Sequence, residues 1–150
     1  MRFSHANVFV RDQAEALAFF TEKLGFEVRQ DISFPDMNYR WLTVGPTDQP
    51  DVALIVSIPV AGVFEPDTIV QINDLVAKGA SGGVHFSSDD VRADIERLRG
   101  HGVEISQEPE ERPYGTDAEF TDPSGNRYRM TQVNYARIDE SVASGALTSN

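Results

Sequence analysis

Six residues spread along the chain have side chains that could bind or transform a small molecule. Two are imidazoles, and the others are an amide, an indole, a phenol and a guanidinium: His5, His85, Asn7, Trp41, Tyr114 and Arg129. An imidazole can ligate a metal ion or act as a general base near neutral pH. A guanidinium pairs with carboxylates and stacks on flat rings. Gathered in one pocket, these groups would suit a planar or carboxylate-bearing organic molecule.

The spacing of these residues indicates which of them can share a surface. Side chains two positions apart in a β-strand lie on the same face of a sheet. His5 therefore shares a face with Asn7, and Gly83 shares a face with His85, if both segments are strands. Tyr114 precedes the seventh predicted strand and could line the rim of a pocket formed by such faces.

Several of these residues also have a purely structural interpretation. Arg129 could form an internal ion pair with Glu119 or Glu104, because buried charges are generally paired. His85 could be a core histidine that is hydrogen-bonded to the backbone, and Trp41 could belong to the hydrophobic core. The sequence leaves both interpretations open.

The elements that would position these side chains occur twice in the same order, a strand, a helix and three strands. In the first copy they are predicted at residues 3–10, 12–25, 26–34, 39–44 and 52–58. In the second copy they are predicted at residues 82–87, 89–102, 103–107, 118–121 and 126–131. Asp12 and Asp89 would begin the two helices, and Gly25 and Gly102 would end them. Two copies of one supersecondary unit explain this pattern.

Two segments lie outside the repeat. Residues 59–81 connect the copies and could contain a short helix at 67–78, although a plain connection is the simpler interpretation. Residues 134–150 are small and polar without strong periodicity, so we expect a loosely ordered tail. The charge run at 108–112 is interpreted as a solvated loop.

The most specific motif is a tight turn that feeds the last predicted strand. It has the sequence DPSGN at residues 122–126, in which Pro123 and Gly125 suit a turn. This motif and the repeated order of elements resemble the glyoxalase/bleomycin resistance protein/extradiol dioxygenase superfamily, also called the vicinal oxygen chelate superfamily. The resemblance covers residues 3–133, which is nearly the full chain.

The resemblance implies an α+β fold in which two βαβββ modules form a curved mixed-sheet bowl around the site. We expect a single glyoxalase-like domain at residues 1–133, followed by a tail at 134–150. Within it, the first module, the connector and the second module would span residues 3–58, 59–81 and 82–133. Two-module members of the family commonly dimerise, sometimes by exchanging modules, so we expect a homodimer.

The resemblance also identifies three metal positions, and this sequence departs from the pattern at two of them. His5 stands at the first position, whereas Gly83 or Gly82 stands at the second and Arg129 at the third. A catalytic metal usually needs about three protein ligands, and an arginine places a fixed positive charge beside the site. We therefore expect no cofactor, with a divalent metal ion as the alternative.

The resemblance implies a metal-free small-molecule-binding protein of the bleomycin-resistance kind, which sequesters or carries an organic ligand. The alternative is a glyoxalase-type lyase, isomerase or dioxygenase, with His5 as a metal ligand or His85 as a general base. No catalytic residue is assigned. A third interpretation, a pure dimerisation module, predicts a filled bowl.

The bulk composition limits the partners and the compartment. The chain has 150 residues, a formal net charge of -11 and no cysteine. The acidic balance disfavours nucleic acid and anionic membranes, which bind clustered basic residues. Without cysteine the chain has no disulfides, which fits a reducing compartment. No signal peptide is evident at the N-terminus, and the longest apolar stretch, residues 52–64, contains Pro59. We expect a cytoplasmic protein.

Overall fold

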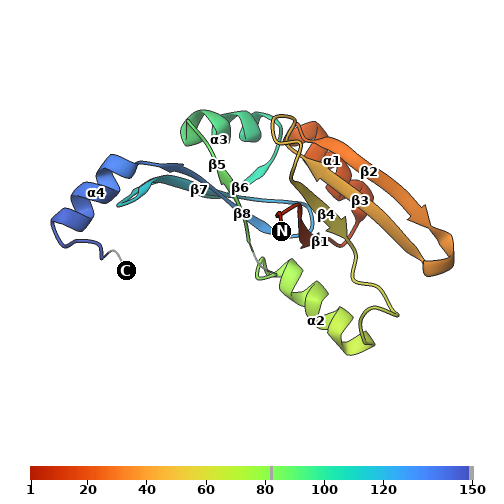
Figure 1. Cartoon of the computed structure of the whole chain (residues 1–150). Helices are drawn as coiled ribbons and strands as arrows, with labels where there is room; N and C mark the ends of the chain where they lie inside the picture. The colour runs from red at the N-terminus through yellow and green to blue at the C-terminus, as the bar shows by residue number, and fades with distance from the viewer. Residues whose placement is uncertain (82, 149–150) are drawn as a thin grey trace. The chain divides into compact units, whose positions relative to one another are not determined.

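The computed structural model describes residues 1–81 and 83–148, which form two compact units (Figure 1). The first unit contains residues 1–81 and 122–126, and the second contains residues 83–121 and 127–148. Each unit contains a four-stranded sheet with one parallel strand pair, so the predicted repeat of strand, helix and three strands is present. Among the described residues, no helix has the length and hydrophobicity needed to cross a membrane.

The first unit is built on a sheet with the strand order β1-β4-β3-β2. Its strands are β1 (His5–Phe9), β2 (Glu27–Phe34), β3 (Tyr39–Gly45) and β4 (Ala53–Ser57). Strand β1 runs parallel to β4, and the other neighbours are antiparallel. Its helical elements are α1 (Gln13–Ala18), the π-helical turn η1 (Phe19–Lys23), the 3-10 turn η2 (Pro35–Met37) and α2 (Pro66–Ala77). The possible helix in the connector is therefore formed.

Local signals in the sequence explain helix α1 and the core beneath it. The Asp12 carboxylate accepts hydrogen bonds from the backbone N–H groups of Ala14 and Glu15, at 2.7 and 2.9 Å. It thereby satisfies donors that a helix start leaves unpaired. Phe19 and Phe20 are fully or almost fully buried, as are the side chains that alternate on one sheet face: Leu42, Val44, Leu54 and Val56. The alternating residues, such as Trp41, lie on the opposite face of the sheet.

The second unit repeats this plan with the strand order β5-β8-β7-β6. Its strands are β5 (Val84–Ser87), β6 (Glu104–Arg112), β7 (Gly115–Thr121) and β8 (Arg127–Val133). Strand β5 is parallel to β8, and the other pairs are antiparallel. Its helices are α3 (Val91–Gly100) and α4 (Tyr135–Ala143). Helix α3 buries Val91, Ile95 and Leu98, and the core also contains the stacked rings of Phe120 and Tyr128, 5.4 Å between centroids.

The DPSGN motif lies in the first unit and contacts the end of strand β1 and helix α2. The Asp122 carboxylate accepts backbone hydrogen bonds from Ser124 and Asn126, at 2.8 and 3.0 Å. The Asn126 amide donates to the Phe9 carbonyl at 2.9 Å. Gly125 has φ +103, and a Cβ there would lie 2.9 Å from the Val76 carbonyl oxygen. Hydrogen bonds within the motif and to Phe9 therefore fix the turn in place.

Three expectations for the second unit need correction. Helix α3 is capped by Asp90 and not by Asp89, since the Asp90 carboxylate accepts from Ala93 N–H at 3.0 Å. The charge run at 108–112 belongs to strand β6 and not to a loop. Residues 135–143 of the expected loose tail form helix α4. Gly82, the alternative second metal position, lies outside the described residues.

Candidate functional site

The six candidate residues fall into two groups, one in each unit. His85, Tyr114 and Arg129 line one pocket of the second unit. In the first unit, the rings of His5 and Trp41 approach to 5.8 Å between centroids. The three candidates of the second unit thus converge on one space, whereas those of the first unit lie along its sheet.

The open face of the second sheet carries a polar row that crosses all four strands. In the strand register, His85 stands beside Arg129, Arg129 beside Glu119, and Glu119 beside Gln107. These residues alternate with the core residues Phe120 and Tyr128, so their side chains point away from the core. The sheet therefore presents imidazole, guanidinium, carboxylate and amide groups side by side.

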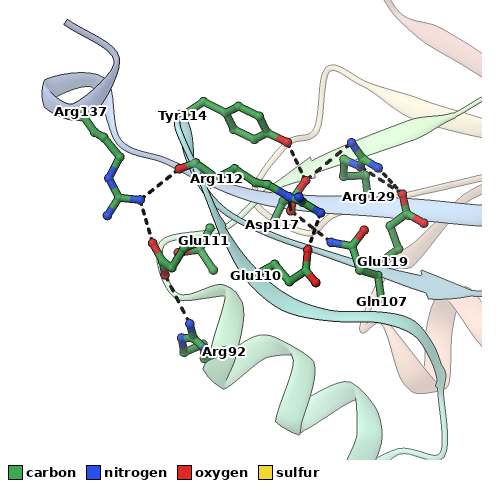
Figure 2. A network of polar contacts seen from close by, with 11 residues as sticks. Arg92, Gln107, Glu110, Glu111, Arg112, Tyr114, Asp117, Glu119, Arg129 and Arg137 are labelled. Atoms are coloured by element: carbon green, nitrogen blue, oxygen red, sulfur yellow. Dashed lines mark hydrogen bonds and ion pairs between the residues drawn. The ribbon is translucent and has the colours of Figure 1, made fainter. Parts of the chain in front are cut away.

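Arg129 is held by two carboxylates of strand β7 (Figure 2). Its Nε donates to Glu119 Oε1 at 3.2 Å, and Nη2 donates to the same oxygen. Its Nη1 lies 3.6 Å from Asp117 Oδ2. The hydrogen bond to Glu119 raises the pKa of Arg129, although desolvation opposes the shift. The ion pair with Glu119 is thus formed, whereas Glu104 stands opposite Thr121 in the register.

Asp117 is the centre of the network, although it was not predicted from the sequence. It is 1% exposed. Its carboxylate accepts from the Tyr114 hydroxyl at 2.8 Å, and from Gln107 Nε2 and Arg112 Nε at 3.2 and 3.3 Å (Figure 2). Burial raises the pKa of Asp117, but these hydrogen bonds and Arg129 outweigh it and the pKa lies below its ordinary value. Asp117 was missed because the strand that contains it was predicted to begin at residue 118.

The pocket beside this network has a volume of about 480 Å³. Its walls are provided by strands β5 and β8 and by the β6–β7 turn: His85, Phe86, Ser87, Tyr114, Arg129, Thr131 and Val133. Both edges of the Arg129 guanidinium are directed at Glu119 and Asp117, so its flat face remains for a ligand. A flat guanidinium face, a phenol and an imidazole together can stack on a planar ring.

The first unit holds the other three candidates on the sheet face opposite its core. Trp41 Nε1 donates to Gln30 Oε1 at 2.8 Å, and Asn7 Oδ1 accepts from the Ser57 hydroxyl at 2.7 Å. His5 Nδ1 lies 3.0 Å from the Ser4 hydroxyl. The Trp41 ring is partly exposed and is not a core residue.

A further pocket of about 400 Å³ in the first unit was not predicted from the sequence. Its wall includes Phe34, Tyr39 and Arg40. The Arg40 guanidinium makes two hydrogen bonds of 2.7 Å to the Asp31 carboxylate, and these lower the pKa of Asp31. The pairing occupies two of the five N–H groups of Arg40.

The residues at the three metal positions implied by the family do not fit a divalent ion. Gly83 has no ligating atom, and the His85 imidazole lies 3.3 Å from where a Gly83 Cβ would be. Arg129 is a cation that is already paired with Glu119 and Asp117. Among residues 1–81 and 83–148, no group of three His, Cys, Asp or Glu residues could hold a metal ion. His5 alone provides a suitable ligand.

The chain is similar to characterised and uncharacterised proteins over most of its length. A sequence model described as Glyoxalase/Bleomycin resistance protein/Dioxygenase superfamily matches residues 2–130. The uncharacterised protein YurT of Bacillus subtilis (strain 168) is 32% identical over 136 residues, which are 88% of this chain and 99% of YurT.

Two solved structures have the same fold. UcmS2 aligns with a TM-score of 0.81 and 44% identity, over 87% of this chain and 97% of its own. TnmS3, described as an antibiotic binding protein from Streptomyces sp. CB03234, aligns with a TM-score of 0.70 and 28% identity, over 89% of this chain and 97% of its own. The α+β fold with two βαβββ-like modules is thus glyoxalase-like, as the sequence predicted.

Proposed function

We propose, from the premise that the chain belongs to the glyoxalase/bleomycin resistance protein/dioxygenase superfamily, that it binds a small organic molecule without a metal ion. The ligand would lie in the pocket of the second unit, against Arg129 and Tyr114. The observation that carries the proposal is the pairing of Arg129 with Glu119 and Asp117 at a metal position of the family. It replaces metal chemistry with a flat cationic surface beside an open pocket.

The charges of the network indicate the class of ligand. Arg112 and Arg129 face Glu110, Asp117 and Glu119, so two positive charges meet three negative charges. A ligand carboxylate would have to displace one of these pairs. Stacking of a planar ring on the guanidinium leaves the pairs intact and contributes about 0.5–2 kcal/mol. Planarity, more than negative charge, is therefore the expected requirement.

The comparisons support a binding function in a general way. TnmS3 is described as an antibiotic binding protein and shares the fold over most of this chain. We propose that this protein also binds an organic molecule, and we make no proposal about which molecule it is. Sequestration or transport of such a ligand requires no catalytic group, so the proposal assigns none.

A calorimetric titration in excess EDTA tests this function. The probes are naphthol, naphthoate and naphthylmethylammonium, which share one ring system and differ in charge. We expect all three to bind and Tyr114→Ala to weaken each by about tenfold, which corresponds to about 1.4 kcal/mol. Arg129→Met should weaken naphthol and naphthoate by a similar factor, whereas the carboxylates that lose Arg129 would attract the cationic probe. Arg127→Met is the matched control, because Arg127 is an exposed arginine of the same strand that does not line the pocket.

Two results would contradict the proposal. If the probes bind in the presence of a divalent metal and not in EDTA, a metal-dependent site of the glyoxalase type is present. If Arg129→Met and Arg127→Met have equal effects, the ligand lies somewhere other than the pocket of the second unit.

A further inference from the structure

Helix α4 follows closely after Val133, which lines the pocket. The helix lies beyond residue 130, where the family match ends. The backbone N–H of Asn134, which caps the helix, donates to the carbonyl oxygen of Tyr114 at 2.9 Å. Gly115 lies against the same segment, since a Cβ there would come within 3.0 Å of the Asn134 nitrogen. The start of α4 and the β6–β7 turn are therefore packed backbone against backbone.

One side chain of α4 extends this attachment across the turn. Arg137 Nη1 donates to Glu111 Oε2 at 2.7 Å and to the Arg112 carbonyl oxygen at 3.1 Å (Figure 2). Glu111 is further held by the Thr116 hydroxyl at 2.8 Å and by Arg92 at 3.3 Å. Arg137 thus fixes the last residues of β6 immediately before Tyr114.

The segment that Arg137 fixes is the rim of the pocket. The Arg112 side chain and the Tyr114 hydroxyl both bond to Asp117, which also faces Arg129. Tyr114 and Arg129 line the pocket. A shift of the β6–β7 turn would therefore move the phenol and disturb the carboxylate that faces the guanidinium.

We infer that Arg137 is a positioning residue for the Tyr114 rim, so that the C-terminal helix α4 shapes the pocket. Its link to ligand affinity rests on the proposed function, whereas its effect on the rim does not. The contact is partly exposed, with 41% of the Arg137 side chain accessible, so its contribution should be modest.

The test compares Arg137→Ala with Arg92→Ala in the full chain. Both variants remove a cation from the same Glu111 carboxylate, but Arg92 is on α3 and, among the residues that the structure describes, makes no hydrogen bond or ion pair with the β6–β7 turn beyond that to Glu111 itself. We expect hydrogen exchange of the Asn134 amide to become about threefold faster in Arg137→Ala and to stay unchanged in Arg92→Ala. Arg137→Lys, which keeps the charge, should restore part of the protection.

A second readout follows the rim itself. The protein is labelled with fluorotyrosine, and the Tyr114 signal is assigned by its loss in Tyr114→Phe. We expect the fluorine signal of Tyr114 to move in Arg137→Ala and to stay in place in Arg92→Ala. Equal effects of the two variants on exchange and on this signal, or no effect of either, would overturn the inference.

Naphthol affinity separates this inference from the proposed function. If naphthol binds the wild type, Arg137→Ala should weaken it by about threefold, in step with the faster exchange. If naphthol fails to bind the wild type while exchange and the fluorine signal respond as expected, the proposed function fails and the positioning role stands.

Discussion

The guanidinium of Arg129 has neighbours of opposite charge on both edges, and these limit what it can offer a ligand. Glu119 and Asp117 direct its N–H groups along the sheet. Removing the cation would leave these two carboxylates facing each other, and like charges raise each other's pKa. Arg129 therefore helps to keep both carboxylates ionised, and the carboxylates in turn hold the guanidinium in place.

Arg129→Glu should convert this arrangement into a weak cation site. Three carboxylates would then face one another, and oxygen ligands of this kind suit Mn²⁺ or Ca²⁺. We expect the variant to be less stable than the wild type in EDTA and to gain about 4 °C in melting temperature with millimolar Mn²⁺. Thermal denaturation measures this. Arg127→Glu, with the same change of charge on the same strand, should gain nothing; an equal gain there would contradict the account.

Asp117 should make stability depend on acid pH. Its folded pKa lies below the ordinary value of about 3.9, so its contribution is fully present above that value and is lost as the pH falls through the folded pKa. Asp117→Asn should lower the free energy of unfolding at neutral pH by about 2–3 kcal/mol. It should also flatten the wild-type decline below about pH 4. Urea unfolding at several pH values measures both; a decline as steep as in the wild type would place the acid sensitivity on other groups.

At the scale of the elements, the β6–β7 turn is the part on which the pocket depends most. Gly115 has φ +141, and a Cβ there would lie 2.0 Å from the Gln132 carbonyl oxygen. Residues other than glycine rarely adopt this conformation. The turn therefore needs glycine both for its backbone angle and for its contact with strand β8.

Gly115→Ala should destabilise the second unit by about 3 kcal/mol and abolish probe binding. Gly100→Ala is the control, because it lies in helix α3 with nothing within 4 Å of its Cβ position. That substitution should be neutral or stabilising, by up to about 1 kcal/mol. Chemical denaturation measures both variants. Equal effects would show that the turn conformation is not a constraint.

The elements were predictable where local chemistry decides the structure. Asp12 and Gly25 mark the ends of the first helical segment because capping and positive φ are properties of those residue types. The start of α3 was predicted one residue early, since Asp89 and Asp90 have equal capping ability. Ser88, whose hydroxyl accepts from Asp90 N–H at 3.0 Å, helps to set the observed start. Helix α4 was missed because residues 134–150 were interpreted together as one small and polar tail.

The site was predictable in part, for a related reason. The residue types at His85, Tyr114 and Arg129 and the two-residue alternation indicated a shared face, and the pocket brings these three together. The pairing of Arg129 with Glu119 was one of two alternatives that the sequence allowed. Asp117 was not predicted, because its role comes from partners on the turn and on two neighbouring strands. Such convergence depends on register, which sequence spacing does not fix.

At the scale of the whole molecule, we propose that the side chains of the pocket bind the ligand directly, without a metal ion. The fold is one that hosts several chemistries, so the residues at the site must decide among them. Gly83 and Arg129, at two of the three metal positions implied by the family, argue against an ion. Protein purified without chelator should therefore contain well below one equivalent of Mn, Fe, Ni or Zn by elemental analysis.

The most direct test is a titration of the ¹⁵N-labelled protein with naphthol in excess EDTA, followed by amide chemical shifts. We expect saturable shifts that concentrate on strands β5 and β8 and on the β6–β7 turn, around His85, Tyr114 and Arg129. Shifts that require an added divalent metal, or that concentrate on residues outside this pocket, would contradict the proposal.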